Sequence, residues 1–126
     1  MAASPAYTAT PRTERATISV ANTNRDGTGT IVNLFTAGAG GSRVERITIC
    51  ATGTTTAGMI RFFLYDGTNF DLWREVSVTA ITPSGTVIAY YFQISNLAFI
   101  LSSGKSLRVA TNNAETFKII AEGGDF

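Results

Sequence analysis

The chain is a series of short runs in which apolar and polar residues alternate, with turn-forming residues between the runs about every 8–12 positions. Alternation with a period of two is typical of β-strands with one buried face, and no segment shows the period of an amphipathic helix. The expected strands are residues 16–20, 30–36, 43–51, 59–65, 70–78, 86–95, 98–101, 106–110 and 116–121, with a bulge near residues 45–46. The sequence therefore predicts an all-β, two-sheet antiparallel β-sandwich of about eight or nine strands with jelly-roll-like connectivity.

A chain of 126 residues is the size of one domain, and its N-terminal part differs from the rest. Residues 1–14 contain Pro5 and Pro11 and very little apolar surface to bury. We expect an extended N-terminal arm over residues 1–14 and the β-sandwich domain over residues 15–126. The arm is either an unattached tail or a segment that becomes ordered against a neighbouring chain, with Tyr7 as its anchor.

Charge is scarce and scattered. The 10 basic and 9 acidic residues make up 15% of the chain and give a net charge of +1. No basic cluster is present, so we expect no binding to nucleic acid. The longest strongly apolar stretch, residues 87–101, is interrupted by polar residues and is too short to span a bilayer, so we expect no membrane partner. The N-terminus does not read as a secretory signal. Low charge predicts that a partner covers part of the surface.

The residue types that usually perform catalysis are few. Histidine is absent, and a single cysteine, Cys50, can form no intrachain disulfide and has no histidine to activate it. Asp66 and Asp71 flank a turn whose chemistry explains them without a metal ion. A sugar-cleaving site needs two carboxylates, and the nearest pair is Glu75 with Asp66 or Asp71. Trp73 shares a strand face with Glu75 and could stack on a sugar, but a small sandwich offers little cleft. The sequence predicts a protein that is not an enzyme and has no cofactor or metal site.

Two expected strands are apolar on both faces. In residues 59–65, Phe62 and its neighbours at period two lie on one face, while Phe63 and Tyr65 lie on the other. Residues 86–95 show the same pattern. Such strands need two covers, one of which is the core of the sandwich. The second cover is either another subunit, which we favour, or a loop of the same chain. The predicted oligomer or capsid contacts are Tyr7, Phe63, Tyr65, Trp73 and Tyr91.

Several passages carry a resemblance to a known group of proteins. They are residues 7–12 (YTATPR), 21–27 (ANTNRDG), 51–59 (ATGTTTAGM), 64–69 (LYDGTN), 72–75 (LWRE), 111–117 (TNNAETF) and 123–125 (GGD). With these passages, the chain resembles small virion proteins of tailed bacteriophages, in the capsid decoration (cement) class. The resemblance implies a non-enzymatic structural protein that binds the major capsid protein as a homo-oligomer, a trimer, and stabilises the shell.

The resemblance also implies a location on the capsid surface of the virion, after synthesis in the host cytoplasm. Two other functions remain open. One is a carbohydrate-binding or structural β-sandwich of a tail fibre, in which Trp73, Tyr90 or Tyr91 stacks on a sugar. The other is a tail or neck connector.

Overall fold

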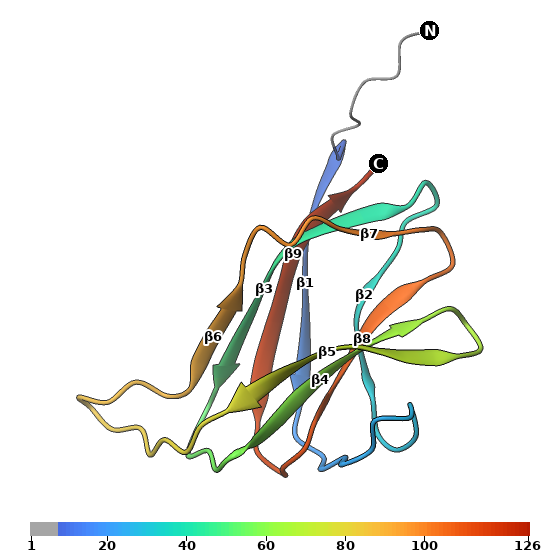
Figure 1. The fold of residues 1–126 in the computed structure, drawn as a ribbon. Helices are drawn as coiled ribbons and strands as arrows, with labels where there is room; N and C mark the ends of the chain where they lie inside the picture. The colour runs from blue at the N-terminus through green and yellow to red at the C-terminus, as the bar shows by residue number, and fades with distance from the viewer. Residues whose placement is uncertain (1–7) are drawn as a thin grey trace, which may run out of the picture.

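The computed structural model describes residues 8–126, which form two antiparallel β-sheets packed face to face (Figure 1). The strands are β1 (Thr10–Ile18), β2 (Val32–Thr36), β3 (Ser42–Ala51), β4 (Gly58–Tyr65), β5 (Phe70–Val78), β6 (Tyr91–Ile94), β7 (Phe99–Leu101), β8 (Ser106–Thr111) and β9 (Phe117–Asp125). The described residues contain no helix, so no helix long and apolar enough to cross a membrane is found among them. The all-β sandwich predicted from the sequence is confirmed.

The chain alternates between the two sheets in the manner of a jelly roll. One sheet has the strand order β1-β9-β3-β6, with β7 also paired to β3, and the other has the order β2-β8-β4-β5. Strands from opposite ends of the chain are neighbours, because β1 pairs with β9 from Thr10↔Asp125 to Ile18↔Phe117. The free edges of the first sheet are β1 and β6, and those of the second are β2 and β5.

The core lies between the sheets and is filled by alternate residues of both. The largest fully buried side chains are Phe35, Phe62, Phe63, Phe117, Ile18, Ile47, Ile49, Ile60, Leu101, Leu107, Ile119 and Val44. All of them except Phe63 belong to this core. The register of β3 against β9 shifts between Val44 and Arg46, which confirms the predicted bulge. The shift keeps both Val44 and Ile47 facing inward although three positions separate them.

Most strand ends lie within two residues of the predicted ones, and the larger differences are at β1, at β6 and at the end of β9, which extends to Asp125. β1 begins at Thr10, five residues earlier than the predicted start of the sandwich at residue 15, because its backbone pairs with the whole length of β9. The remaining residues of the predicted arm include Tyr7, and residues 1–7 lie outside the described part of the chain.

The predicted strand over residues 86–95 is reduced to the four residues of β6. Before it, the segment 79–90 forms a loop that projects from the molecule (Figure 1, lower left). A tight turn closes the tip of this loop, where the Ser84 amide donates to the Val87 carbonyl oxygen at 2.9 Å and the Ser84 hydroxyl accepts from the Thr86 and Val87 amides. The polar turn diverts the apolar residues that follow it away from the sheet.

Candidate contact surfaces

The outer face of β4 carries Arg61, Phe63 and Tyr65, as the alternation predicts, but the chain's own loop between β1 and β2 covers much of it. Phe63 has no exposed surface and meets the Phe70 ring edge-on, with 6.3 Å between the ring centroids. Phe70 lies in turn against Gly27 of the loop, where an added Cβ atom would stand 2.4 Å from the Phe70 Cβ. Of the two covers considered for this face, another subunit or a loop of the same chain, the loop is therefore the one present. Phe63 is not available for contact with another protein.

Arg61 ties the same loop to the sheet. Its side chain is 3% exposed, and its Nη1 donates to the Asn22 carbonyl oxygen at 3.2 Å and to Asn112 Oδ1 at 3.0 Å. Its Nε donates to Glu75 Oε2 at 3.1 Å, and the exposed Arg25 donates to the same oxygen at 2.9 Å. A buried guanidinium needs such partners because an unpaired buried charge is costly. Glu75 is thus an ion-pair partner of two arginines and not half of a carboxylate pair.

Tyr65 and Trp73, two of the predicted contact residues, are half-buried and packed within the chain. Tyr65 stacks on Phe70 with 4.2 Å between the ring centroids. The Arg108 guanidinium lies over the Tyr65 ring, 4.4 Å from its centroid. Trp73 meets the Phe99 ring of the opposite sheet at 4.6 Å, so it fills the space between β5 and β7. Both aromatic rings therefore have intramolecular packing partners.

Among the predicted contact residues that lie within residues 8–126, Tyr91 is the exposed one, at 51%. It belongs to a larger surface that we name the uncharged edge, formed by residues 76–104. None of the chain's Asp, Glu, Lys or Arg residues lies between Glu75 and Lys105. This segment contains the end of β5, the projecting loop, β6 and β7 (Figure 1). Its exposed large apolar side chains are Val87, Ile88, Tyr91, Phe92 and Ile100, of which Ile88 is 78% exposed.

Most of this edge was not predicted from the sequence, because clusters of charge are a usual sign of a binding surface and this edge is marked by their absence. The longest gap between charged residues is a signal visible in the printed sequence. Its meaning depends on the fold, because the same gap would be unremarkable if residues 76–104 lay in the core. The structure places the gap on one side of the sandwich.

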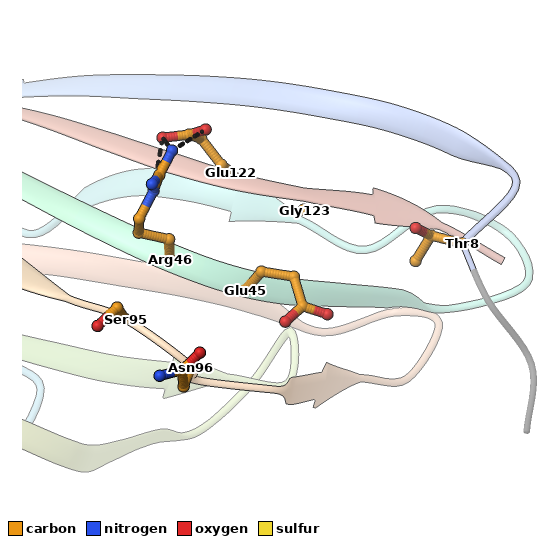
Figure 2. A pocket seen from close by; sticks show the side chains of 7 residues that line it. All are labelled: Thr8, Glu45, Arg46, Ser95, Asn96, Glu122 and Gly123. Carbon is orange, nitrogen blue, oxygen red and sulfur yellow. Dashed lines mark hydrogen bonds and ion pairs between the residues drawn. The ribbon is translucent and has the colours of Figure 1, made fainter.

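A hollow of about 360 Å³ lies beside the connection between β6 and β7 (Figure 2). Arg46 and Glu122 both line it and are joined by three hydrogen bonds of 2.7, 2.9 and 3.1 Å, which lower the pKa of Glu122. Glu45, the other carboxylate of the hollow, pairs with Arg43. A general acid requires a raised carboxyl pKa, whereas the pKa of Glu122 is lowered. Glu122 is therefore not suited to act as a general acid.

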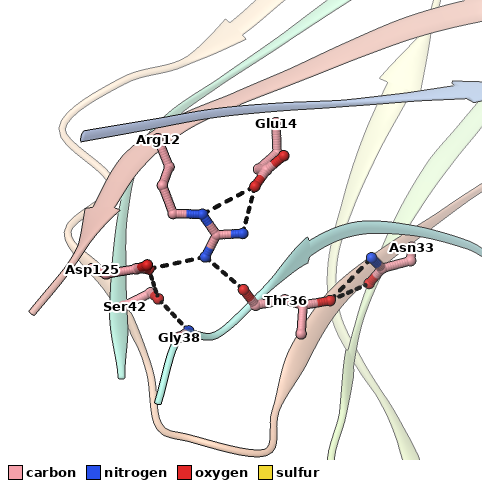
Figure 3. A network of polar contacts seen from close by, with 7 residues as sticks. All are labelled: Arg12, Glu14, Asn33, Thr36, Gly38, Ser42 and Asp125. Atoms are coloured by element: carbon pink, nitrogen blue, oxygen red, sulfur yellow. Dashed lines mark hydrogen bonds and ion pairs between the residues drawn. The ribbon is translucent and has the colours of Figure 1, made fainter. Parts of the chain in front are cut away.

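Arg12 organises a polar network at the end of the sandwich where the described chain begins (Figure 3). Its Nη1 donates to Asp125 Oδ1 at 2.9 Å and to the Thr36 carbonyl oxygen at 2.6 Å, and its guanidinium lies 4.1 Å above the Phe35 ring. The Ser42 hydroxyl also donates to Asp125 Oδ1, at 2.5 Å. Hydrogen bonds from Ser42 and then from Arg12 lower the pKa of Asp125. The network joins β1, β2, β3 and β9.

The two aspartates that flank the β4–β5 turn do not meet at a metal site. Asp66 Oδ1 accepts hydrogen bonds from the Asn69 amide at 2.7 Å and the Thr68 amide at 2.9 Å, and these bonds lower its pKa. Asp71 lies in β5, and its register partner in β4 is Leu64. Within residues 8–126, no three potential ligands among His, Cys, Asp and Glu come together. Asp66 has the turn-stabilising geometry that its sequence context predicts.

No protein-family model matches the chain, and no curated protein is similar to it in sequence. Among solved structures, it is similar to a chain of the structure titled "Cyanophage Pam1 capsid asymmetric unit". The TM-score is 0.52 at 12% sequence identity, and the match covers 100% of this chain and 94% of that chain. At this identity the similarity shows a shared fold.

Proposed function

We propose that this chain is a non-enzymatic structural protein of a bacteriophage virion, a capsid decoration (cement) protein that binds the outside of the shell in groups of three. The observation that carries the proposal is the uncharged edge, where five large apolar side chains are exposed on a segment of the chain that contains no charged residue. Depletion of charge distinguishes the core of a protein–protein interface from the rest of a surface. The uncharged edge is therefore suited to binding another protein.

The structural neighbour supports the choice of partner. Because the match covers nearly all of both chains, the two proteins have comparable length, and the neighbour's title places it in the capsid of a phage. A small jelly-roll protein in that setting agrees with the resemblance seen in residues 7–125 of the sequence. The resemblance supplies the major capsid protein as the partner and three as the number of copies at each position.

The proposed mechanism is thermodynamic. A protein that binds the assembled shell and not its separated subunits stabilises the shell by RT ln(1 + [L]/Kd). Three copies that each bridge neighbouring shell subunits add their modest contacts through avidity. Every copy therefore makes the loss of a shell subunit less favourable without any chemical step.

The carbohydrate-binding alternative loses two of its three stacking residues. Tyr90 is 5% exposed and donates its hydroxyl proton to the Ser77 carbonyl oxygen at 2.6 Å. Trp73 packs between the sheets against Phe99. A sugar-stacking platform needs exposed ring faces, so Tyr91 alone would have to serve.

The test is to mix the purified chain with phage particles that lack it and to image the particles that sediment. We expect density for the chain outside the shell at threefold positions, and shells that release DNA at a higher temperature than untreated shells. Phage particles that have no capsid shell, such as isolated tails, are the control. Density at the neck or on a fibre would replace this proposal with one of the alternatives, and failure to sediment with any particle would overturn it.

A further inference from the structure

β6 is a free edge strand, and its outward backbone groups are identifiable. The Ala51 amide donates to the Tyr90 carbonyl oxygen at 2.8 Å, which marks Tyr90 and Ala51 as a hydrogen-bonded pair. In an antiparallel ladder such pairs alternate with unbonded ones. With the register Cys50↔Tyr91 and Thr48↔Gln93, the N–H and C=O groups of Tyr91 and Gln93 point away from β3. Within residues 8–126 no other backbone group bonds to them.

This edge lacks the features that usually prevent strands from pairing with another molecule. Edge strands are commonly protected by lysine, by inward-pointing charge, by proline or by a covering loop. β6 and its flanking residues carry no charge, and Pro83 lies eight positions before β6, in the loop. Phe92, on the inner face of the sheet, is 39% exposed because no strand lies beyond it.

We propose that a second copy of this chain occupies the edge, with β6 paired antiparallel to β6 of the partner about a twofold axis. The free groups fit this arrangement because they belong to residues two positions apart. When the axis passes through Phe92, Tyr91 faces Gln93 of the partner subunit, and Gln93 faces Tyr91 of the partner subunit. Each facing pair exchanges two backbone hydrogen bonds, so all the outward N–H and C=O groups of both residues are satisfied.

Side chains and charge agree with a second copy as the occupant. Phe92 would lie opposite Phe92 of the partner subunit, at a position without backbone bonds, where side chains approach most closely. Antiparallel pairing also brings the loop 79–90 of each copy toward the β6–β7 connection of the other. Neither β6 nor its flanking residues in sequence carry a charge, so antiparallel pairing of β6 with itself places no like charges directly opposite each other.

The inference is independent of the assignment to a virion, because it concerns two copies in solution. It is also compatible with groups of three on a shell. Threefold grouping would follow from the positions that the shell offers, and a twofold contact through β6 would join copies that belong to adjacent groups.

The experiment measures the mass of the full chain by sedimentation equilibrium across a wide range of concentration. We expect wild-type protein to reach twice the 13.4 kDa of one chain. Gln93→Pro removes an N–H that points away from β3, so it leaves the β3–β6 pairs intact, and edge strands accept proline at such a position. It should raise the dimer dissociation constant roughly tenfold or more, whereas the control Gln93→Ala keeps the N–H and should stay close to wild type.

A second variant covers the case in which the proline variant does not fold. Phe92→Lys sets two positive charges opposite each other at the proposed axis, and it should also be monomeric. Amide hydrogen exchange gives an independent reading, since the Tyr91 and Gln93 amides should exchange slowly in wild-type dimer and quickly in the monomeric variants. A wild-type chain that stays monomeric, or an oligomer whose mass and whose Tyr91 and Gln93 exchange rates are unchanged by both variants, would overturn the proposal.

Discussion

At the residue scale, Arg61 is a buried charge whose hydrogen bonds hold the loop between β1 and β2 over β4. We expect Arg61→Ala to lower the free energy of unfolding by about 2–3 kcal/mol, because Asn22 and Asn112 lose a charged donor and Glu75 loses its buried partner. Urea unfolding measures the change. The matched control is Arg25→Ala, which removes the exposed partner of the same carboxylate and should cost less than about 1 kcal/mol. Equal losses would show that burial of the arginine is unimportant.

Asp125 gives the protein part of its sensitivity to acid. Hydrogen bonds from Ser42 and Arg12 lower its pKa in the folded state from the ordinary value of 3.8. At mildly acidic pH the unfolded chain therefore binds more protons than the folded one, and the free energy of unfolding rises with pH. The stabilisation is complete above the ordinary value and is lost as pH falls through the folded value.

We accordingly expect Asp125→Asn to reduce the difference in urea midpoint between pH 7 and pH 3. Asp71→Asn is the control, because Asp71 has no ion-pair partner within residues 8–126. If both variants retained the full difference, the Arg12 network would have no part in acid unfolding.

Single residues also mark where prediction from sequence ends. Alternation placed Phe62 and Phe63 correctly on opposite faces of β4. It could not reveal what covers the outer face, because the cover comes from the loop around Gly27, which is distant in sequence and contains no apolar run of its own. The contact of Gly27 with Phe70 depends on the path of the loop, and a short-range pattern does not encode that path.

At the element scale, the loop between β1 and β2 acts as a third layer over part of the second sheet. Gly27 and Gly67 both have a positive φ, at 89° and 98°, so alanine carries a similar backbone cost at either position. Only at Gly27 would the new Cβ collide, with Phe70, since nothing lies within 4 Å at Gly67. We expect Gly67→Ala to cost about 1 kcal/mol and Gly27→Ala at least about 1 kcal/mol more, measured by thermal unfolding. A matching cost at both positions would argue against tight packing of the loop.

The first half of β1 belongs to the sandwich, and truncation tests this. Deletion of residues 2–14 removes five β1–β9 pairs together with Arg12, and we expect a loss of at least about 3 kcal/mol in the free energy of unfolding. Deletion of residues 2–7 is the control, because it leaves every described contact of β1 in place. A protein of unchanged stability after the longer deletion would support residues 1–14 as an arm separate from the sandwich.

Elements were predicted better in their number and order than in their ends. β1 starts early because its polar residues Thr10, Arg12 and Glu14 pair through the backbone, and backbone pairing leaves no apolar alternation to detect. β6 is short for the opposite reason. The apolar run of residues 86–95 looks like a continuous strand, but the Ser84 turn and the Tyr90 hydrogen bond to Ser77 direct its first half into a loop.

At the scale of the whole molecule, a substitution on the uncharged edge is expected to change association and to leave the free energy of unfolding nearly unchanged. Ile88→Asp changes a side chain that is 78% exposed, so the free energy of unfolding should stay within about 0.5 kcal/mol of wild type. Association with a second copy, or with a shell, should weaken clearly because a carboxylate would have to be desolvated. Thr86→Asp at the tip of the same loop is the control for added charge. A large loss of stability in Ile88→Asp would mean that the loop is part of the core.

The adjacency of Thr10 and Asp125 has a practical consequence. A peptide joined before Thr8 and another joined after Phe126 would leave the molecule at the same pole, next to each other, with the β6 side unobstructed. A short linker between those two ends, with new ends opened at the Ser84 turn, would give a circular permutant that keeps every strand. The fold is thus suited to carrying two fused peptides side by side on one molecule.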